Sequence, residues 1–356
     1  MRKRKIEISL FNVLLCLIVV LIHLMSGAMK PPLTFEAPLY KIFLVCWRLS
    51  TFVVQAFIFL SGLKTFMNGK EEKYGRFLLK RLKTVVIPYI AAVMLYYLYF
   101  VYAEKYFPFS VGDYLGYLIR GDMAAQFYFV IIIVQFYLLY PLWKLILKRV
   151  KPGLGILVAA VLNIVLGLYS FTILSKMFNG YQYPYLDRTI TTYIIYWVGG
   201  MYAGLHYDKF INGVVKHRKI LGALFAVFAI VDLSAVFMQR MGIITPMNLD
   251  MLHALYCMAA ILFGLSLMCS IKGCYVSAVA AIDRASYYIY LIHVIFIFIT
   301  DRFITPFLPT SSTLLIFIAR CVIVYCACAI FVCIYTGIST AKLRIRSRMT
   351  DVTRSI

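Results

Sequence analysis

The feature that most constrains the fold is a series of ten apolar runs, which together take up most of the 356 residues. A helix needs about 20 apolar residues to cross the ~30 Å hydrocarbon core of a bilayer. Hydrophobic residues make up 63% of the chain and charged residues 14%, against about 25% charged residues in soluble domains. Because lipid offers backbone groups no water, such runs cross the membrane as helices. The sequence therefore predicts an all-α integral membrane protein with about ten transmembrane helices. The runs cover residues 6–29, 40–63, 84–103, 124–147, 154–174, 189–205, 220–239, 247–270, 275–300 and 313–335.

The gaps between the runs are short and contain no linker, low-complexity segment or repeat. The sixth run is the shortest, and Asp283 and Arg284 interrupt the ninth. We therefore expect one transmembrane domain over residues 1–356, with no sizeable soluble domain.

Basic residues are concentrated in alternate gaps. The chain has 36 Lys and Arg against 14 Asp and Glu, which gives a net charge of +22. Four basic residues precede the first run, seven, three and four follow the second, fourth and sixth runs, and five follow the tenth. The gap after the eighth run has Lys272, joined by Arg284 if the ninth run starts late, and the odd-numbered gaps carry one or two each. Loops rich in Lys and Arg stay in the cytoplasm, so we expect both termini to be cytoplasmic. This placement also argues against nucleic acid as a partner.

Four ionisable side chains on four different runs are expected in the outer half of the membrane. At 1.5 Å per helical residue, His23 lies ~25 Å from the cytoplasmic end of the first run. Arg48, Arg320 and His253 lie ~12, ~11 and ~9 Å below the outer edge of their own runs. His293 in the ninth run lies either at a similar depth or near the midplane, according to where that run begins.

Such residues are costly in a bilayer, at about 2.5–3.5 kcal/mol for a charge at a helix centre on insertion scales. They usually face the bundle interior or a wet cavity. One interpretation is structural, with the side chains joining helices by hydrogen bonds. The other is a shared polar site open to the outside, which the similar depth of the four residues favours.

Other patterns carry less information. Asp232 is an intramembrane carboxylate that could be a proton site or a structural partner. The nine cysteines show no metal-binding spacing, so no metal is predicted. The seven basic residues after the second run are first a topology signal, and could also hold anionic lipid or the phosphates of a cofactor.

Five short motifs, in this order, resemble those of the acyltransferase 3 family of multi-spanning bacterial membrane proteins. They include a histidine in the first run, a Phe-Phe-x-x-Ser-Gly-like segment in the second and a Ser-Tyr-x-x-Tyr-Leu-x-His-like segment in the ninth. In full they are Val19-Val20-Leu21-Ile22-His23, Phe57-Ile58-Phe59-Leu60-Ser61-Gly62, Lys80-Arg81-Leu82-Lys83 with Ile87-Pro88-Tyr89, Phe127-Tyr128-Phe129 with Phe136-Tyr137-Leu138-Leu139-Tyr140-Pro141, and Ser286-Tyr287-Tyr288-Ile289-Tyr290-Leu291-Ile292-His293.

Two positions depart from the family pattern. Asn12 stands where the family often has an arginine that helps to bind the acyl donor, and Gln126 stands where it often has a histidine. These departures resemble the branch that acts on Gram-positive surface polysaccharides, including the intercellular adhesin modification proteins.

The resemblance implies that an acyl group, often acetyl or succinyl, moves from cytoplasmic acyl-CoA to a hydroxyl of a cell-surface glycan. Acyl-CoA would be a co-substrate, and no tightly bound cofactor is implied. A neutral imidazole accepts a proton near neutral pH, so His23 is the candidate base or transient acyl carrier.

The remaining candidate residues fall into two sets with different substrates. One set would bind the glycan or stabilise an oxyanion, and the other would bind the CoA phosphates. The first comprises Arg48, His253, His293, Arg188 and Arg320, and the second comprises Lys80, Arg81 and Lys83.

Two rival interpretations stay open on sequence alone. A glycan exporter or flippase would use the polar spans as a path and carry out no chemistry. A lipid-modifying membrane O-acyltransferase of a different fold would require another histidine–asparagine pattern in its later spans. Consumption of acyl-CoA by the purified protein on addition of a glycan separates the exporter from the enzymes.

Overall fold

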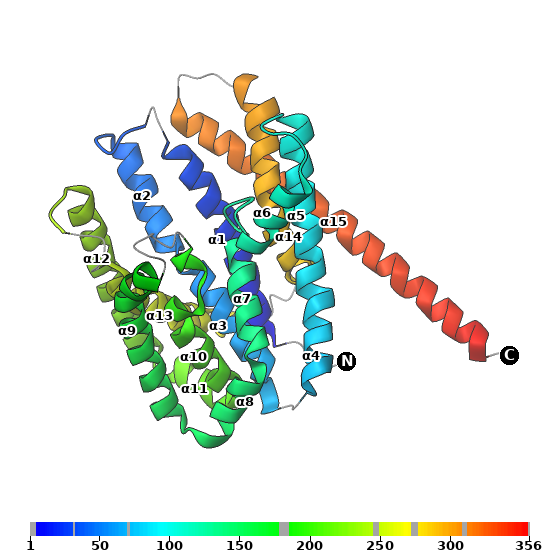
Figure 1. The fold of residues 1–356 in the computed structure, drawn as a ribbon. Coiled ribbons are helices and arrows are strands. Elements are labelled where there is room, and N and C mark those ends of the chain that lie inside the picture. The colour runs from blue at the N-terminus through cyan, green and yellow to red at the C-terminus, as the bar shows by residue number, and fades with distance from the viewer. Residues whose placement is uncertain are drawn as a thin grey trace. The chain divides into compact units, whose positions relative to one another are not determined.

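In a computed structural model, the chain is all-α over the residues that the structure describes, which are 5–30, 33–69, 72–177, 185–244, 249–271, 277–307 and 312–354. Figure 1 follows these helices from α1 in blue to α15 in orange and red. No strand occurs in these ranges. The all-α prediction is therefore confirmed.

Each of the ten predicted apolar runs contains helix. The elements in chain order are α1 (Ile6–Ala28), α2 (Pro38–Ser50), α3 (Val53–Phe66), η1 (Met67–Gly69), α4 (Tyr74–Arg81), η2 (Leu82–Val86), α5 (Ile87–Leu98), η3 (Tyr99–Ala103), α6 (Val111–Arg120), α7 (Tyr128–Leu138), α8 (Tyr140–Arg149), α9 (Pro152–Met177), η4 (Leu186–Arg188), η5 (Ile190–Thr192), α10 (Ile194–Leu205), α11 (Tyr207–Lys216), α12 (Arg218–Arg240), α13 (Leu249–Met268), α14 (Ser277–Phe303), η7 (Thr305–Phe307) and α15 (Thr313–Arg354).

Among the described residues, six helical stretches are long and apolar enough to cross a membrane, and α7 with α8 makes a seventh if this bent pair is one span. Three further apolar stretches of the described residues have 10–17 residues, Pro152–Leu166 within α9, Ile194–Leu205 and Leu252–Met268 within α13, and α10, with 12 residues, rises only ~18 Å. The transmembrane character is confirmed, while the number of ten spans stays a prediction. The six stretches are Ile6–Ala28, Pro38–Phe66, Tyr74–Ala103, Arg218–Arg240, Ser277–Phe307 and Thr313–Ala341.

Two of the predicted continuous runs are broken in the structure. The fourth bends by 56° between α7 and α8, where Pro141 lies in the first turn of α8 and cannot donate a backbone hydrogen bond. The second is interrupted at Thr51 and Phe52, between α2 and α3. No glycine or proline marks that second break in the sequence.

Two helices extend further than the apolar runs predicted. α4 and η2 continue directly into α5, so Lys80, Arg81 and Lys83 lie on a helix rather than in a loop. α15 continues well beyond residue 335 as one helix of 42 residues. A helix that leaves the membrane loses no backbone hydrogen bonds, so the change from apolar to basic residues does not end it.

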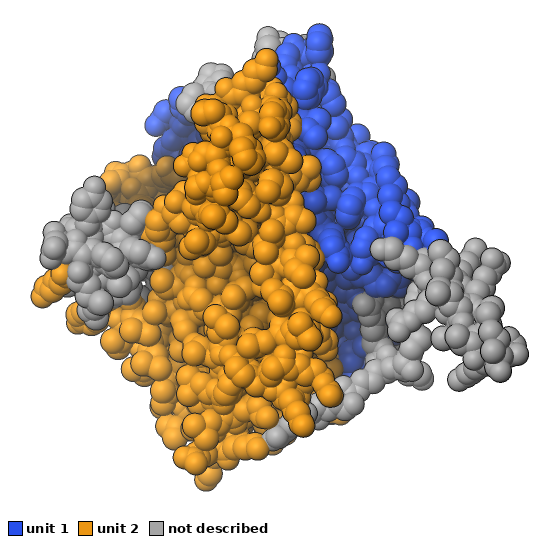
Figure 2. Space-filling view, turned by 45° about the vertical axis from the view of Figure 1, so that its right-hand side comes forward, with its two compact units in different colours: residues 1–47, 273–356 blue, residues 48–272 orange. Residues whose placement is uncertain are grey.

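The chain divides into two compact units, coloured separately in Figure 2. Unit 1 comprises Met1–Trp47 with Gly273–Ile356, and unit 2 comprises Arg48–Lys272. In unit 1, α1 packs against α14 and α15, although the first and last helices are far apart in the sequence. Unit 1 therefore joins the predicted first and ninth runs.

Close helix packing in unit 2 depends on small residues. α3 and α10 pack together, and a Cβ added at Gly200 or Gly204 would overlap the backbone of Phe59 or Leu63. Small residues allow such close backbone approach between membrane helices. This contact fixes the half of the second run that follows the break at Thr51.

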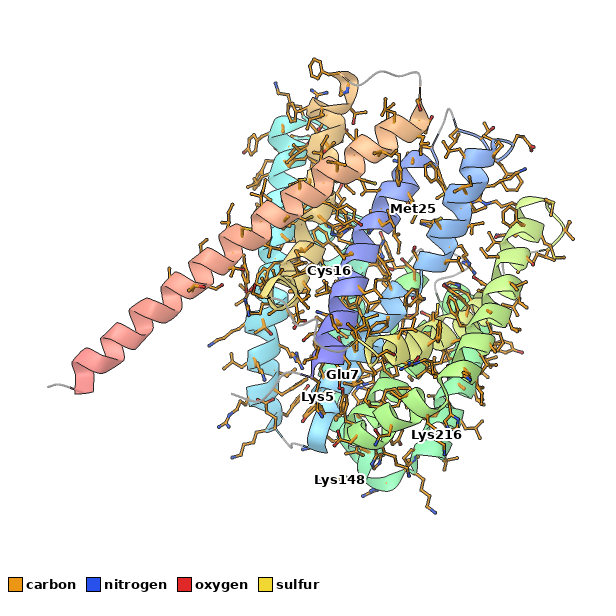
Figure 3. The ribbon with its side chains drawn as sticks, turned by 180° about the vertical axis from the view of Figure 1, so that it is seen from behind. Lys5, Glu7, Cys16, Met25, Lys148 and Lys216 are labelled. Atoms are coloured by element: carbon orange, nitrogen blue, oxygen red, sulfur yellow. The ribbon has the colours of Figure 1, made fainter. Side chains whose placement is uncertain are left out.

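The ends of helices within each unit follow the predicted charge pattern. In unit 2, Lys148 near the end of α8 and Lys216 at the end of α11 lie at the same end of the unit (Figure 3). In unit 1, Lys5 and Glu7 mark one end of α1, Met25 lies near the other end and Cys16 lies between them (Figure 3). The basic gaps that follow the fourth and sixth runs therefore share one side of unit 2, as the positive-inside pattern requires.

The cytoplasmic orientation of the termini stays a prediction, which a topology reporter can test. We expect a reporter that is active only outside the cell to give signal after the first, third, fifth, seventh and ninth runs. It should stay silent after the even-numbered runs, because these gaps carry the basic residues. Signal from a fusion within residues 64–83 would overturn the placement of the whole chain.

Candidate functional site

In unit 1, two predicted site histidines from distant parts of the chain lie against each other. The rings of His23 on α1 and His293 on α14 have centroids 5.1 Å apart and are tilted by 48°. His293 is fully buried. No hydrogen bond links the His23 ring to another residue that the structure describes. The sequence predicted both residues for the site, and the structure brings them together.

The hydrogen bonds of His293 define its tautomer. Its Nδ1 lies 3.1 Å from the backbone oxygen of Ile289. A carbonyl can only accept, so Nδ1 carries the proton and Nε2 presents a lone pair. That Nε2 is buried and has no hydrogen-bond partner in the described part of the chain. Leaving a buried acceptor unsatisfied is costly, so a hydroxyl that reached it would gain a hydrogen bond.

A second polar layer lies on the same face of α1. The Asn12 side-chain amide donates to Asp283 Oδ1 at 2.9 Å and to Ser286 Oγ at 2.8 Å, and Ser9 donates to Asp283 Oδ2 at 2.9 Å. Asn12 and His23 are separated by three helical turns, or ~16 Å. Asn12 therefore belongs to a hydrogen-bonded network with α14 at the position where the family often has arginine. The sequence did not predict this network. The spacing of Asn12 and His23 could have indicated it, because it places both side chains on one face of the helix.

An ion pair in unit 1 lies about one helical turn beyond His23 along α1. Arg320 on α15 forms an ion pair with Asp301 on α14, with Nη2 and Oδ2 2.7 Å apart. The guanidinium lies against Gly27, where an added Cβ would be 2.8 Å from Nη2. Gly27 follows His23 by four residues, so the two share one face of α1. Arg320 is therefore placed close to the histidine pair along α1.

In unit 2, Arg48 and His253 share one carboxylate. Arg48 donates to both oxygens of Asp232 at 2.7 Å, and His253 Nδ1 lies 3.2 Å from Asp232 Oδ2. Asp232 is fully buried. Asp232 is therefore a structural partner of Arg48 and His253, two contacts that the sequence did not reveal.

His253 also contacts two groups that sequence reasoning missed. Its Nε2 lies 3.1 Å from Thr51 Oγ1 and 3.3 Å from Cys257 Sγ. Cys257 follows His253 by one turn of α13 and is fully buried, whereas Thr51 is partly exposed. Cys257 could have been predicted from the four-residue spacing, but Thr51 lies about 200 residues away.

Arg188 in unit 2 is built into its own loop. Its guanidinium donates to the backbone oxygen of Arg120 and stacks on Tyr185 at 4.6 Å. Its backbone oxygen accepts from Gln135 at 2.7 Å. These contacts indicate that Arg188 orders the loop that contains it.

The three predicted donor-binding residues differ in their surroundings. Lys80 and Lys83 are exposed. Arg81 instead stacks on Phe77 and Tyr137, at 5.0 and 4.5 Å from the ring centroids, and donates to Thr65 Oγ1 at 3.1 Å. The two lysines are therefore available to a phosphate, whereas the Arg81 side chain packs between helices α4 and α7.

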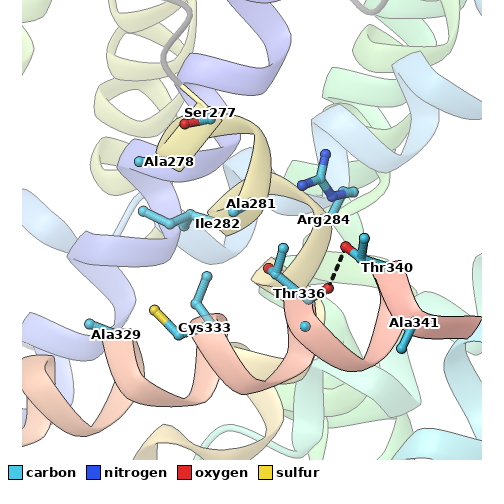
Figure 4. Close-up of a pocket in the computed structure, with 12 residues that line it drawn as sticks. Ser277, Ala278, Ala281, Ile282, Arg284, Ala329, Cys333, Thr336, Thr340 and Ala341 are labelled. Carbon is cyan, nitrogen blue, oxygen red and sulfur yellow. Dashed lines mark hydrogen bonds between the residues drawn. The ribbon is translucent and has the colours of Figure 1, made fainter. Parts of the chain in front are cut away.

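A groove of about 1020 Å³ lies between α14 and α15 in unit 1 (Figure 4). Small side chains such as Ala278, Ala281 and Ala329 line it, together with Arg284. The hydroxyl of Thr340 donates back to its own helix at Thr336. The described residues that line this groove include no imidazole and no carboxylate, and the histidine pair lies elsewhere in unit 1.

The structure thus gathers the predicted glycan-site residues in separate groups. His23 and His293 lie together in unit 1 with Arg320 nearby, and Arg48 and His253 lie together in unit 2. That all of them surround one substrate stays a prediction.

Comparison with known proteins defines the class. Residues 6–333 match the acyltransferase 3 family, described as an acyltransferase domain. The chain belongs to this family, which confirms the resemblance of its motifs. With its apolar helices and its bacterial relatives, it is a multi-pass protein of the bacterial cell membrane. No solved structure matches the chain.

Individual relatives carry two kinds of name. A putative membrane-bound acyltransferase of Bacillus subtilis (strain 168), YfiQ, is 25% identical over 323 residues, which are 88% of each chain. A probable poly-beta-1,6-N-acetyl-D-glucosamine export protein of Staphylococcus aureus (strain N315) is 25% identical over 227 residues, 62% of this chain and 63% of the relative. The protein of that name from Staphylococcus epidermidis is 25% identical over 300 residues, 82% of this chain and 81% of the relative. The chain thus spans 63% of the length of the S. aureus relatives that it matches.

Proposed function

We propose that the protein is a membrane O-acyltransferase that moves an acyl group, such as acetyl or succinyl, from cytoplasmic acyl-CoA to a hydroxyl of a cell-surface glycan. The observation that carries the proposal is the His23–His293 pair, which lies inside the region matched by the acyltransferase family. The names of the staphylococcal relatives support a polysaccharide as the acceptor. The thioester supplies the activated acyl group, so acyl-CoA acts as co-substrate.

In this proposal His23 is the general base. Its ring takes the proton of the acceptor hydroxyl while the oxygen forms a bond to the acyl carbon. The carbon–sulfur bond then breaks, and His23 returns the proton to the CoA thiolate. His293, with its lone pair on Nε2, orients the acceptor hydroxyl by accepting or relaying a hydrogen bond.

Among the three candidate arginines, Arg320 has the best position to act in this reaction. It lies one turn from His23 along α1, and a guanidinium there would stabilise the oxyanion of the tetrahedral intermediate. Arg48 donates through two nitrogens to the buried Asp232, and Arg188 holds its loop. Arg320 gives one hydrogen bond to Asp301, and its Nε has no partner in the described part of the chain. We propose that Arg48 and Arg188 instead maintain the shape of the site that binds the glycan acceptor.

The donor side is assigned to Lys80 and Lys83. We expect Lys80→Gln combined with Lys83→Gln to raise the apparent KM for acyl-CoA at least ~10-fold, because a hydrogen bond to a charged group contributes ~1.5–3 kcal/mol. The value of kcat should change little. Initial rates against acyl-CoA concentration measure both constants.

Lys216→Gln combined with Lys219→Gln is the matched control, since it removes the same charge from another basic gap. This control should leave the KM unchanged. An unchanged KM in the Lys80 and Lys83 variant would show that these residues act only as a topology signal.

A second candidate function is export of the polysaccharide, which the printed names of the staphylococcal relatives favour. Mass spectrometry of surface glycans from cells with and without the protein separates the two. The enzyme proposal expects normal amounts of glycan outside the cell, without the ester-linked acyl group. Loss of the glycan from the cell surface would favour the exporter.

A further inference from the structure

Hydrogen bonds connect a carboxylate, an imidazole and a hydroxyl in series within unit 2. Asp232 Oδ2 lies 3.2 Å from His253 Nδ1, and His253 Nε2 lies 3.1 Å from Thr51 Oγ1. The three residues come from α12, α13 and the break between α2 and α3. A hydroxyl, a base and a group that orients the base form the signature of an activated nucleophile.

The order of the contacts sets the direction of proton transfer. A carboxylate only accepts, so the neutral His253 carries its proton on Nδ1 and turns the lone pair of Nε2 toward Thr51. The Thr51 hydroxyl also lies 2.7 Å from the backbone oxygen of Arg48. Its single proton therefore serves either the carbonyl or the imidazole, and rotation about the Cβ–Oγ1 bond exchanges the two. Asp232, itself held by Arg48, stabilises the imidazolium that proton uptake would create.

The backbone at Thr51 adds a second element of such a site. Thr51 precedes the first residue of α3 by two positions, and the first amides of a helix have no partner within it. These amides carry partial positive charge and would stabilise the oxyanion on the acyl group when the Thr51 oxygen attacks it.

Thr51 also has a position suited to transfer across the membrane. It lies ~20 Å along the candidate span Pro38–Phe66 from one end and ~22 Å from the other. A hydroxyl near the midplane can be loaded from one side and unloaded from the other. Cys257 Sγ is also within reach of His253 Nε2, but it is fully buried, whereas Thr51 is partly exposed.

We propose that Thr51 is a covalent acyl carrier, activated by His253 and Asp232, that takes the acyl group from a thioester as an O-acyl ester. His253 Nε2 takes the hydroxyl proton as Oγ1 bonds to the acyl carbon. The carbon–sulfur bond breaks, and the proton passes to the leaving thiolate. The acceptor hydroxyl then attacks this ester rather than the thioester. The bond between Oγ1 and the acyl carbon breaks, and the proton that the general base takes from the acceptor hydroxyl is returned to Oγ1. This inference rests on the proposed acyltransferase function.

The test uses the full-length purified protein in lipid nanodiscs with acetyl-CoA and no acceptor. Peptide mass spectrometry should find one acetyl group on Thr51, which is lost when the acceptor is added. Thr51→Val, which has nearly the same shape, should lose the adduct, and glycan acylation should fall by about 10²–10⁴-fold. Thr51→Ser should keep the adduct, which shows that the fold tolerates substitution here.

Cys257→Ala is the matched control, because it removes the other group near His253 Nε2 and should leave the adduct on Thr51. An adduct on Cys257, or full glycan acylation by Thr51→Val, would overturn the carrier proposal. If Thr51→Val stays active while His23→Gln is inactive, the acyltransferase proposal stands and the carrier proposal fails. If the wild-type protein consumes no acyl-CoA with or without acceptor, the acyltransferase proposal fails as well.

Discussion

Replacement of His23 by glutamine is expected to reduce glycan acylation by about 10²–10⁴-fold, the usual effect of losing a general base. Glutamine keeps a hydrogen-bonding side chain of similar reach but cannot take up a proton at neutral pH. The His23 ring contacts His293 at 5.1 Å and forms no hydrogen bond to another described residue, so the fold should tolerate the change. The measurement is the amount of ester-linked acyl group per glycan in cells, normalised to the protein in the membrane.

Two comparisons make the result specific. His23→Ala should be as inactive as His23→Gln, whereas a structural histidine would tolerate glutamine far better than alanine. His217→Gln, at an exposed position before α12, should acylate at the wild-type rate. Near-normal acylation by His23→Gln would show that His23 is structural and that the proposed mechanism is wrong.

Replacement of Asp232 by alanine is expected to destabilise the protein by about 3–5 kcal/mol. The change removes two hydrogen bonds of 2.7 Å to Arg48 and leaves a largely buried guanidinium without its counter-ion. His253 loses its partner as well. Thermal unfolding of the purified protein in detergent and the yield of inserted protein both measure this effect.

The Arg320–Asp301 pair offers a matched control of equal length but different exposure. Its ion-pair distance is also 2.7 Å, yet the Asp301 side chain is 41% exposed, against 0% for Asp232. Asp301→Ala should cost less than Asp232→Ala, because the buried Arg320 loses one hydrogen bond to a partly solvated carboxylate, whereas Arg48 loses two to a fully buried one. Combining Asp232→Leu with Arg48→Met should restore most of the stability, because it removes both charges. Equal losses at Asp232 and Asp301 would contradict the buried ion-pair account.

The helices could be predicted from the sequence because a long apolar run in a bilayer must satisfy its backbone hydrogen bonds within itself, which only a helix does locally. The run at residues 6–29, for example, became α1 almost unchanged. The break at Thr51 could not be predicted, because Leu49-Ser50-Thr51-Phe52 contains neither glycine nor proline. That break accompanies contacts with α13, which local composition does not encode.

In the candidate site, too, the sequence predicted some features and missed others. Helical rise placed His23 at membrane depth, and the motif in the ninth run singled out His293. Their contact required α1 to pack on α14, although 270 residues separate the two histidines along the chain. Asp232 looked isolated for the same reason, since Arg48 is 184 residues away. Depth follows from distance along one helix, whereas partners follow from packing between helices.

The central claim is that this chain carries out acyl transfer, and purified protein in sealed vesicles tests it most directly. Radiolabelled acyl-CoA is supplied on the side that bears the basic gaps, and a glycan is supplied on the other side. We expect labelled ester on the glycan and free CoA in equal amounts, with neither formed by the His23→Gln variant. Movement of glycan across the vesicle membrane with no consumption of acyl-CoA would contradict the claim and identify the protein as an exporter.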